Sequence, residues 1–581
     1  MSGIENQSAE VIAPVEKSSE DAAKAKQSKD GLPGELEVKR PVIATWRLVI
    51  ILLCIALGLF LSLMDTTIVS TMLYTISDEF GGFRLSSWIV LSYTLAYVGC
   101  AVFVARLSDV VGRKFALLAC FVIFLAASMA CAASKNLNQL IGFRAWQGVG
   151  GAGLYAMAMI IYPEISPPSL LPVVSSIIGI IVALAGISGP IIGGLFTTYT
   201  SWRWAFWING PCAFVPAVAL FFTWPNDFHA TSVISFKHLD YLGTLLIMLG
   251  CVLFVFILNE AAVRAYAWKS APVILIFIIS GLAWIALVFW QWVVSWHPKL
   301  QLLRPQLPFR LLTNRVMLAG FVSTILTGFV MLLTIVNIPI RAQIVNLKDA
   351  IGSGILLLPL MGSTAVGSAL GGAVSAKKNN TFWTLNLASI FMLIGSALLS
   401  TLPESVEPVA KQYGFEVILG LGLGLSLSTI TFLTSMQVDF EDHAVAQGIV
   451  AQARVFGGSI GIAISFIVFN QKVQDALTGV LTPEKLDDFY RSPTAILGFS
   501  IREQLYVRDT YIDVFTVDMR ICAGISAACL IVTLFTYQRN PQSIKERLAD
   551  LEEVYLRTEA AAAAREGERQ DACYIKGMGS K

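Results

Sequence analysis

The sequence predicts an all-α polytopic membrane protein, and three observations lead to this fold class. Hydrophobic residues make up 56% of the chain and charged residues only 14%, whereas about 25% of a soluble domain is charged. The mean hydropathy is +0.70. The apolar residues also gather in uncharged blocks, for example residues 48–64 and 115–134. Blocks of roughly 20 apolar residues are long enough to cross a bilayer as helices.

The apolar blocks between polar breaks number about fourteen. They begin near Leu48, Ser86, Phe115, Leu140, Pro172, Trp204, Tyr241, Pro272, Val316, Gly352, Phe382, Gly414, Val445 and Ile521. The two blocks that start at Tyr241 and Pro272 lie between two sets of six. We therefore expect two pseudo-symmetric six-helix bundles and two linker transmembrane helices.

The predicted domain boundaries follow from these blocks. A polar, disordered N-terminal tail covers residues 1–45, and a first six-helix bundle covers 46–225. The two linker helices and their flanking loops occupy 226–315. A second six-helix bundle covers 316–538 and includes a long extracellular loop at 471–517, and a second tail covers 539–581.

An internal repeat relates the fourth and fifth spans to the twelfth and thirteenth, which supports two related halves. Gly142, Phe143, Gly148 and Gly150 recur as Gly414, Phe415, Gly420 and Gly422, and Gly186 and Gly189 recur as Gly458 and Gly461. All six pairs share one offset along the chain. A pair of related halves is a common plan among secondary transporters.

Lysine and arginine in the short loops orient the spans, because such residues accumulate on the cytoplasmic side. The loops on one side contain more lysine and arginine than those on the other. They hold Arg106, Arg113, Lys114, Lys299, Arg304, Arg310, Arg315, Lys377 and Lys378. Arg539, Lys545 and Arg547 follow the last span on this same side. Both termini are therefore predicted to be cytoplasmic. The expected location is the plasma membrane, with the vacuolar membrane as an alternative.

Several functional classes lack support in the sequence. No Walker sequence, nucleophile–base constellation or zinc-like spacing of Cys and His occurs. The formal net charge of +2 does not indicate a nucleic-acid partner. We expect neither an enzyme nor a bound cofactor or metal. The expected partners are the lipid bilayer, protons and a small-molecule substrate, and the oligomeric state stays open.

The loop after the second span has a distinctive order of charges. It reads Arg106-Leu-Ser-Asp109-Val-Val-Gly112-Arg113-Lys114. A tight turn between helices favours glycine, and an aspartate at one helix end can pair with an arginine across the turn. Such a loop could latch one face of the protein shut. The simpler alternative is ordinary positive charge on the inner side.

This loop resembles the hallmark loop of the major facilitator superfamily, Gly-x-x-x-Asp-x-x-Gly-Arg-Arg/Lys, with Ala105 in place of the first glycine. Further segments resemble the fourteen-span drug:proton antiporter branch: residues 63–69, 144–148, 189–194 and 202–211. The resemblance covers nearly the whole membrane portion. It implies the major facilitator fold and, in a fungal-type protein, efflux of drugs or toxins.

The segment around Pro190 has the composition of a close helix contact. Gly186, Gly189 and Gly193 are three to four residues apart, and Gly194 follows. Glycines at this spacing share one helical face and let a neighbouring backbone approach, while Pro190 removes a backbone hydrogen bond. In the resembled branch this segment marks exporters. Generic small-residue packing is the alternative.

Three polar residues in apolar spans are candidates for proton coupling: Asp65, Arg144 and Gln147. A charged residue in a membrane helix is costly and normally faces the bundle interior. A carboxylate there can bind and release a proton as its surroundings alternate between wet and dry. The alternatives are a snorkelling Arg144 near the interface and an Asp65 close to the outer headgroups.

In the second half, Glu416 aligns with Arg144 through the repeat, and Arg454 lies within a later span. Both are candidates for the substrate path or for pairing across the bundle, with an interfacial anchor as the alternative for Glu416. The predicted function is proton-driven export of small amphipathic molecules by alternating access. The competing hypotheses are a proton-coupled importer, such as a siderophore-iron carrier, and a non-transporting membrane sensor.

Overall fold

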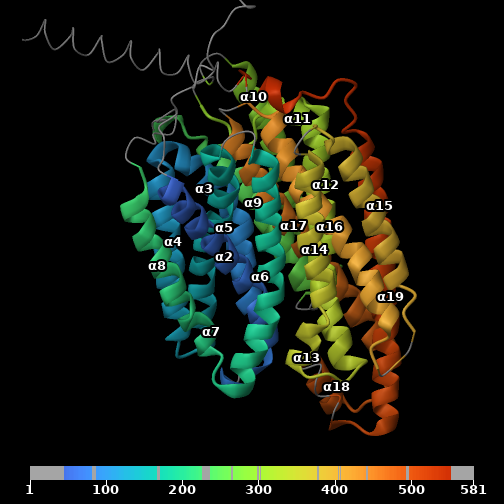
Figure 1. Ribbon diagram of the computed structural model, residues 1–581. Helices are drawn as coiled ribbons and strands as arrows, with labels where there is room; N and C mark the ends of the chain where they lie inside the picture. The colour runs from blue at the N-terminus through green and yellow to red at the C-terminus, as the bar shows by residue number, and fades with distance from the viewer. Residues whose placement is uncertain are drawn as a thin grey trace, which may run out of the picture. The chain divides into compact units, whose positions relative to one another are not determined.

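The computed structural model describes residues 45–80, 87–166, 170–225, 236–262, 266–297, 300, 303–375, 378–403, 405, 407–439, 442–491, 496, 498–547 and 549–550. They belong to one compact unit, Ala44–Lys581, and are almost entirely helical (Figure 1). The predicted all-α fold class is confirmed. The predicted tails lie outside the described residues, apart from Thr45 and residues 539–547 and 549–550.

The first half of the unit contains seven helices. They are α2 (Thr45–Phe80), α3 (Ser87–Val111), α4 (Arg113–Ala132), α5 (Leu137–Ile165), α6 (Leu171–Tyr199), α7 (Arg203–Trp207) and α8 (Asn209–Thr223). The helices α7 and α8 follow each other with one residue, Ile208, between them, and together they form the sixth span.

The linker and the second half follow. The linker contains the 3-10 helix η4 (Phe236–His238), α9 (Tyr241–Ala262), α10 (Ala271–Trp296) and α11 (Phe309–Thr313). The second half contains α12 (Arg315–Ile344), α13 (Ala350–Ile355), α14 (Leu358–Ser375), α15 (Thr381–Leu399), α16 (Ala410–Gln437), α17 (His443–Leu477), α18 (Pro483–Arg491) and α19 (Ile501–Leu534).

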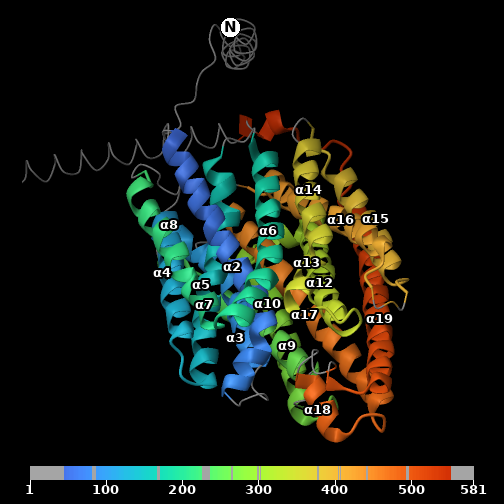
Figure 2. The same cartoon turned by 60° about the horizontal axis from the view of Figure 1, so that its bottom comes forward.

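Helix packing repeats between the two halves. In the first half, α5 packs against α3, α4 and α2, and α8 packs against α2 and α4. In the second half, α16 packs against α14, α15 and α12, and α19 packs against α12 and α15. The helices α5 and α16, which carry the glycine repeat, therefore hold equivalent places. The halves meet where α6 contacts α14 and α16, and where α17 contacts α3 and α5 (Figures 1 and 2).

Thirteen helical segments in the described part of the chain are long and apolar enough to cross a membrane. The fourteenth predicted span is α5, which has 29 residues. It is less apolar than the others because it is rich in glycine and contains Arg144, Gln147 and Glu164. It packs against α2, α3, α4 and α17, so these polar residues lie inside the helix bundle.

The two linker helices differ in their packing. The helix α9 packs against α3 of the first half and α17 of the second half, as well as against α10. The helix α10 is mostly exposed, with 22% of its apolar window buried. Such exposure is expected of a helix that faces lipid. Of the two linker helices, α9 is therefore the one that packs against both halves.

The connector before the last span is shorter than predicted. The sequence predicts a loop at 471–517, but α17 continues to Leu477 and α19 begins at Ile501, with α18 between them. The polar residues in 501–518 concealed the start of α19. Its buried residues, such as Val507, Tyr511 and Val514, recur at helical spacing, which places one face of this segment against the bundle.

The glycines of α6 face two neighbours rather than one. A Cβ at Gly186 would contact Met361 of α14, whereas a Cβ at Gly189 would collide with Thr67 of α2. The glycines therefore permit the approach of two neighbouring helices, whereas the sequence predicts one. Gly193 and Gly194 are buried, and Pro190 lies inside the continuous helix. Through these glycines α6 packs closely against α2 of its own half and α14 of the other half.

Close packing between α6 and α14 generates a stability prediction. At Gly372 of α14, a Cβ would collide with Ser176 Oγ and with the backbone oxygen of Pro172. Gly372→Ala should therefore destabilise the protein by about 1–3 kcal/mol, the usual cost of overpacking. Gly362→Ala in the same helix is the control, because nothing lies within 4 Å of a Cβ there. Thermal unfolding of the purified variants checks this, and equal midpoints would contradict the contact.

Candidate functional site

Three predicted residues, Asp65, Arg144 and Gln147, meet inside the first half. Arg144 Nη1 on α5 donates a hydrogen bond to Asp65 Oδ2 on α2 and pairs with it as an ion pair. It also donates to Gln147 Oε1 at 2.7 Å, and Gln147 Nε2 donates to Asp65 Oδ1 at 2.9 Å. All three residues are fully buried. Arg144 is therefore turned into the bundle, and the snorkelling alternative for this residue is wrong.

Further groups complete this polar network. Asn209 Nδ2, at the start of α8, donates to Asp65 Oδ1 at 3.3 Å, and Gln147 Nε2 donates to Ser128 Oγ at 2.8 Å. The Arg144 guanidinium lies 4.3 Å from the centre of the Tyr93 ring. Sequence reasoning included Asn209 in a resembling segment but did not single it out, because no periodicity relates α8 to α2.

The network is chemically suited to respond to a proton. A buried carboxylate is tolerated when a cation and hydrogen bonds compensate its charge, and Asp65 has both. Protonation of Asp65 would cancel its charge and leave Arg144 without a counter-ion. Binding of one proton would therefore alter the interaction that joins α2 to α5.

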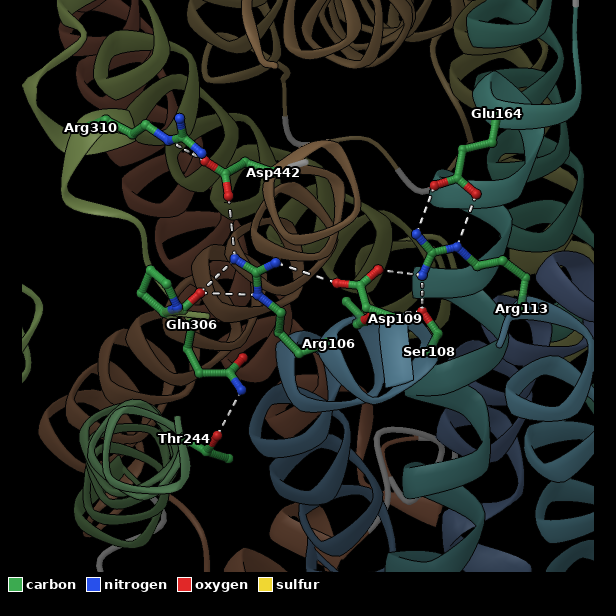
Figure 3. Close-up of polar contacts among 11 residues, drawn as sticks. Arg106, Ser108, Asp109, Arg113, Glu164, Thr244, Gln306, Arg310 and Asp442 are labelled. Atoms are coloured by element: carbon green, nitrogen blue, oxygen red, sulfur yellow. Dashed lines mark hydrogen bonds and ion pairs between the residues drawn. The ribbon is translucent and has the colours of Figure 1, made fainter. Parts of the chain in front are cut away.

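Two of the predicted latch residues, Asp109 and Arg113, lie side by side where α3 meets α4 (Figure 3). Gly112 forms the turn with φ 92°, a left-handed conformation that favours glycine. Arg113 Nη1 pairs with Asp109 Oδ1 at 2.7 Å. Arg113 Nε and Nη2 bind the two carboxylate oxygens of Glu164 on α5 at 2.9 and 2.8 Å. The predicted Asp–Arg pairing is confirmed, and it extends to Glu164. Lys114 does not join these ion pairs among the described residues.

Arg106 connects this turn to the second half and to the linker (Figure 3). Its Nη1 donates to Asp109 Oδ2 at 3.3 Å, and its Nη2 donates to Asp442 Oδ1, just before α17, at 3.4 Å. Its Nη2 and Nε also donate to the Pro305 oxygen at 2.6 and 3.0 Å. Arg310 Nε donates to Asp442 Oδ2 at 2.5 Å. Arg106 is fully buried, so the alternative of ordinary surface charge is wrong for this residue.

Two further residues near this turn, Ala105 and Lys114, have contacts of their own. Ala105, where the resembled loop has glycine, faces Gly448 of α17, and a Cβ at Gly448 would lie 2.7 Å from the Ala105 Cβ. The glycine that permits close approach is thus on the opposite helix. Lys114 lies with its Nζ 5.3 Å from the centre of the Phe221 ring, a cation–π contact within the first half.

Glu416 does not join the Asp65 network among the described contacts. It is fully buried on α16, which excludes the interfacial-anchor alternative. Gln412 Nε2 donates to its Oε1 at 2.8 Å, and Arg341 Nη1 of α12 donates to Gln412 Oε1 at 3.1 Å. Glu416 and Arg341 therefore approach each other through one bridging glutamine in the second half.

Arg454 crosses between the halves. It is 5% exposed on α17, and its Nη1 donates to the hydroxyl oxygen of Tyr155 on α5. The rings of Tyr93, Tyr97 and Tyr155 follow one another with centres 5.8 and 6.2 Å apart. Since Arg144 lies over Tyr93, this tyrosine cluster extends from Arg144 to Arg454.

Asp518 on α19 is a buried carboxylate that sequence reasoning missed. Ser465 Oγ donates to its Oδ2 at 2.6 Å, and Asn337 Nδ2 donates to Ser465 Oγ at 2.8 Å. Tyr511 donates to Asn337 Oδ1 at 3.0 Å. The predicted loop at 471–517 and a span start at Ile521 hid this residue. The helical spacing of the buried residues between Val507 and Asp518 is the signal that could have found it.

The opposite end of the first half is held by Glu79, beyond the apolar part of α2. Trp202 Nε1 and Arg203 Nη1 donate to its two oxygens at 2.6 and 2.7 Å. Partial burial raises the pKa of Glu79, but these two hydrogen bonds outweigh it and leave the pKa below its ordinary value. The carboxylate therefore stays ionised at neutral pH and ties the end of α2 to the start of α7.

The described residues contain no group of three or more His, Cys, Asp or Glu side chains that could hold a metal ion. The polar groups of the bundle interact instead with one another. Their chemistry is that of ion pairs and hydrogen bonds that protonation can rearrange.

Comparisons with known proteins give the family. The sequence profile of the Major Facilitator Superfamily matches residues 55–462. The MFS-type transporter FPY5 of Fusarium mangiferae is 35% identical over 508 residues, covering 86% of this chain and 85% of the relative. Multidrug resistance protein 3 of Bacillus subtilis (strain 168) is 30% identical over 436 residues, covering 74% of this chain and 82% of the relative.

A solved structure gives the same fold. The proton:xylose symporter XylE superposes with a TM-score of 0.55 at 13% identity, covering 87% of this chain and 99% of that protein. At that identity the likeness concerns the fold alone. Together with the repeated helix packing and the charged loop at the α3–α4 turn, the profile and the relatives show that this chain belongs to the Major Facilitator Superfamily of membrane transporters.

Proposed function

We propose that the protein exports small amphipathic organic molecules in exchange for protons, by alternating access. The observation that carries this proposal is the buried network of Asp65, Arg144 and Gln147. It is the one place in the described first half where a fully buried carboxylate is paired with a fully buried arginine. A proton that binds there changes the charge balance between two helices, which is what coupling requires.

The cycle follows from this charge balance. A proton reaching Asp65 from the outer side neutralises the carboxylate and releases Arg144 from its ion pair. The change in helix contacts favours the inward-open arrangement, in which the proton leaves and the substrate binds. Each proton that moves down the gradient supplies about 2.3 kcal/mol per 100 mV. That energy biases the two arrangements in favour of export.

The latch supplies the gate on the cytoplasmic side. In the proposed topology, with both termini cytoplasmic, the α3–α4 turn faces the cytoplasm. The contacts of Arg106 with Asp442 and Pro305 would hold that side closed, and their loss would open it. Alternating access then consists of a movement of the two halves that makes and breaks this set of ion pairs.

Export and a broad substrate range are supported by the relatives and by α6. One relative is named a multidrug resistance protein and another, the MFS-type efflux pump LUC4 of a Fusarium species, is 28% identical over 435 residues. The α6 segment with Gly186, Gly189 and Pro190 resembles the corresponding segment of drug:proton antiporters. The plasma membrane is the proposed location.

The coupling prediction concerns Asp65→Asn and Arg144→Ala. Either change removes one partner of the ion pair, so a gradient should no longer drive accumulation of substrate. Losing one coupled proton lowers the attainable accumulation ratio about 50-fold per 100 mV. The measurement is proton-driven uptake by inside-out vesicles of a panel of dyes, azoles and fungal metabolites.

Asp513→Asn is the matched control, because Asp513 is an exposed aspartate on α19 whose contact with Lys472 is 3.8 Å. This variant should transport like the unchanged protein. Unchanged gradient-driven uptake by Asp65→Asn, at equal protein levels, would remove Asp65 from the mechanism. Uptake of a siderophore-iron complex into right-side-out vesicles, together with poor growth under iron limitation of cells that lack the protein, would favour the siderophore importer. Binding without flux would favour the sensor.

The latch prediction concerns Asp442→Asn. This change removes the carboxylate that pairs with both Arg106 and Arg310. Breaking a buried ion pair costs about 3–5 kcal/mol, so the closed latch should lose most of its advantage. A cysteine at the buried position Gln306 should then react at least severalfold faster with an impermeant maleimide in inside-out vesicles.

Asp439→Asn is the control for this experiment. Asp439 also contacts Arg310, at 3.5 Å, but its side chain is 72% exposed, and exposed pairs contribute little. Labelling should therefore stay at the original rate. Equal labelling rates in the two variants would mean that Asp442 does not hold the gate.

A further inference from the structure

Among the buried arginines that the structure describes, Arg454 is the one with two side-chain nitrogens that lack a hydrogen-bond partner, whereas Arg341 and Arg547 each have one such nitrogen. Arg454 is 5% exposed, and no described residue forms a hydrogen bond with its Nε or Nη2. No carboxylate in the described part of the chain forms an ion pair with it. By contrast, Arg106, Arg113 and Arg144 each pair with at least one carboxylate. A buried, unpaired charge is strongly unfavourable, so the site is suited to a group that supplies the missing negative charge.

The two unpartnered atoms define the shape of that group. The Nε–H and the adjacent Nη2–H lie on one edge of the planar guanidinium, where they bind the two oxygens of a carboxylate. The same chain contains this geometry in occupied form. Arg113 Nε and Nη2 bind Glu164 Oε2 and Oε1 at 2.9 and 2.8 Å. Arg454 presents the same pair of donors, and the described part of the chain provides no acceptor for them.

The remaining donor of Arg454 fixes the guanidinium in place. Its Nη1 donates to the Tyr155 hydroxyl, on a helix of the other half. The backbone of Arg454 packs directly against Gly328 of α12, where a Cβ would collide with it. The free edge of the guanidinium therefore lies at the contact between the two halves, which is the region that the proposed alternating-access cycle opens.

The surroundings indicate what the rest of the molecule is like. Tyr93, Tyr97 and Tyr155 are fully buried and form a continuous cluster beside Arg454. Aromatic rings pack favourably against other rings in offset or edge-on arrangements. A ligand with an aromatic or other unsaturated ring next to its carboxylate would use both features.

We propose that Arg454 binds the carboxylate of the transported molecule, and that the substrates are aromatic or unsaturated organic acids in their anionic form. This inference deepens the proposed export function and rests on it for the direction of transport. Recognition itself depends only on the Arg454 edge and the tyrosine cluster. The test is therefore a binding experiment that needs no proton gradient.

The experiment uses the full-length protein, purified in detergent. Thermal unfolding is measured with benzoate, salicylate, cinnamate, 1-naphthoate and picolinate, and with the methyl ester of each. We expect acids to raise the unfolding temperature more than their esters do. In Arg454→Gln this difference should vanish, with acid affinity falling about 10- to 100-fold, as expected for charge-assisted hydrogen bonds.

Two further variants keep the test decisive. Arg502→Gln removes one positive charge from an exposed arginine on α19 and should leave the preference for acids intact. Arg454→Lys keeps the charge and most of the volume but lacks the two-pronged edge. It should bind the acids about tenfold more weakly, even if Arg454→Gln does not fold.

The possible outcomes separate the two proposals. Equal responses to acids and esters in the unchanged protein, or an acid preference that survives in Arg454→Gln and Arg454→Lys, would overturn the carboxylate site. Acid binding that depends on Arg454, together with an absence of proton-driven flux, would support the site and contradict the proposed export. Proton-driven flux of neutral compounds without acid binding would support the proposed export and contradict the carboxylate site.

Discussion

The compensation of charge inside an apolar helix bundle is the constraint on which the rest of this structure depends. A charged side chain in a membrane is costly unless other groups balance it. Asp65 and Arg144 balance each other within the first half, and Arg113 is balanced by Asp109 and Glu164. Each of these pairs joins different helices. The positions of the helices and the protonation state of the carboxylates are therefore linked by the same interactions.

Close backbone contacts between helices are the second constraint on this structure. Glycines at the contacts between α6, α14 and α2 let the helices approach until side chains such as Ser176 and Thr67 touch the opposing backbone. Without a hydrophobic driving force between helices in lipid, such van der Waals contact is a main source of stability. It also gives the halves well-defined surfaces, so that their relative movement is limited to a few arrangements.

Much of the fold could be predicted because it depends on composition and local order. Uncharged blocks revealed the spans, and the glycine repeat revealed the relation of α5 to α16. Asp65 and Arg144 stood out because charges in apolar blocks are rare. The order of Asp109, Gly112 and Arg113 likewise identified a turn whose residues interact locally.

The remaining site residues escaped prediction because their partners are far away in the sequence. Glu164, Asn209 and Asp442 each lie near the end of a helix, where a polar residue needs no special explanation. Only the packing of distant helices brings them to Arg113, Asp65 and Arg106. Asp518 was hidden for another reason, since the polar start of α19 resembles a loop when its helical spacing is overlooked.

The position of Arg106 has a consequence for how the proposed gate would move. One guanidinium simultaneously binds Asp109 of the first half, Asp442 of the second half and the Pro305 carbonyl of the linker. These contacts cannot be given up one at a time without leaving a buried group unsatisfied, which is costly. Opening should accordingly be cooperative, with few partly open molecules. A disturbance in the linker at Pro305 would then change the populations of both end states together.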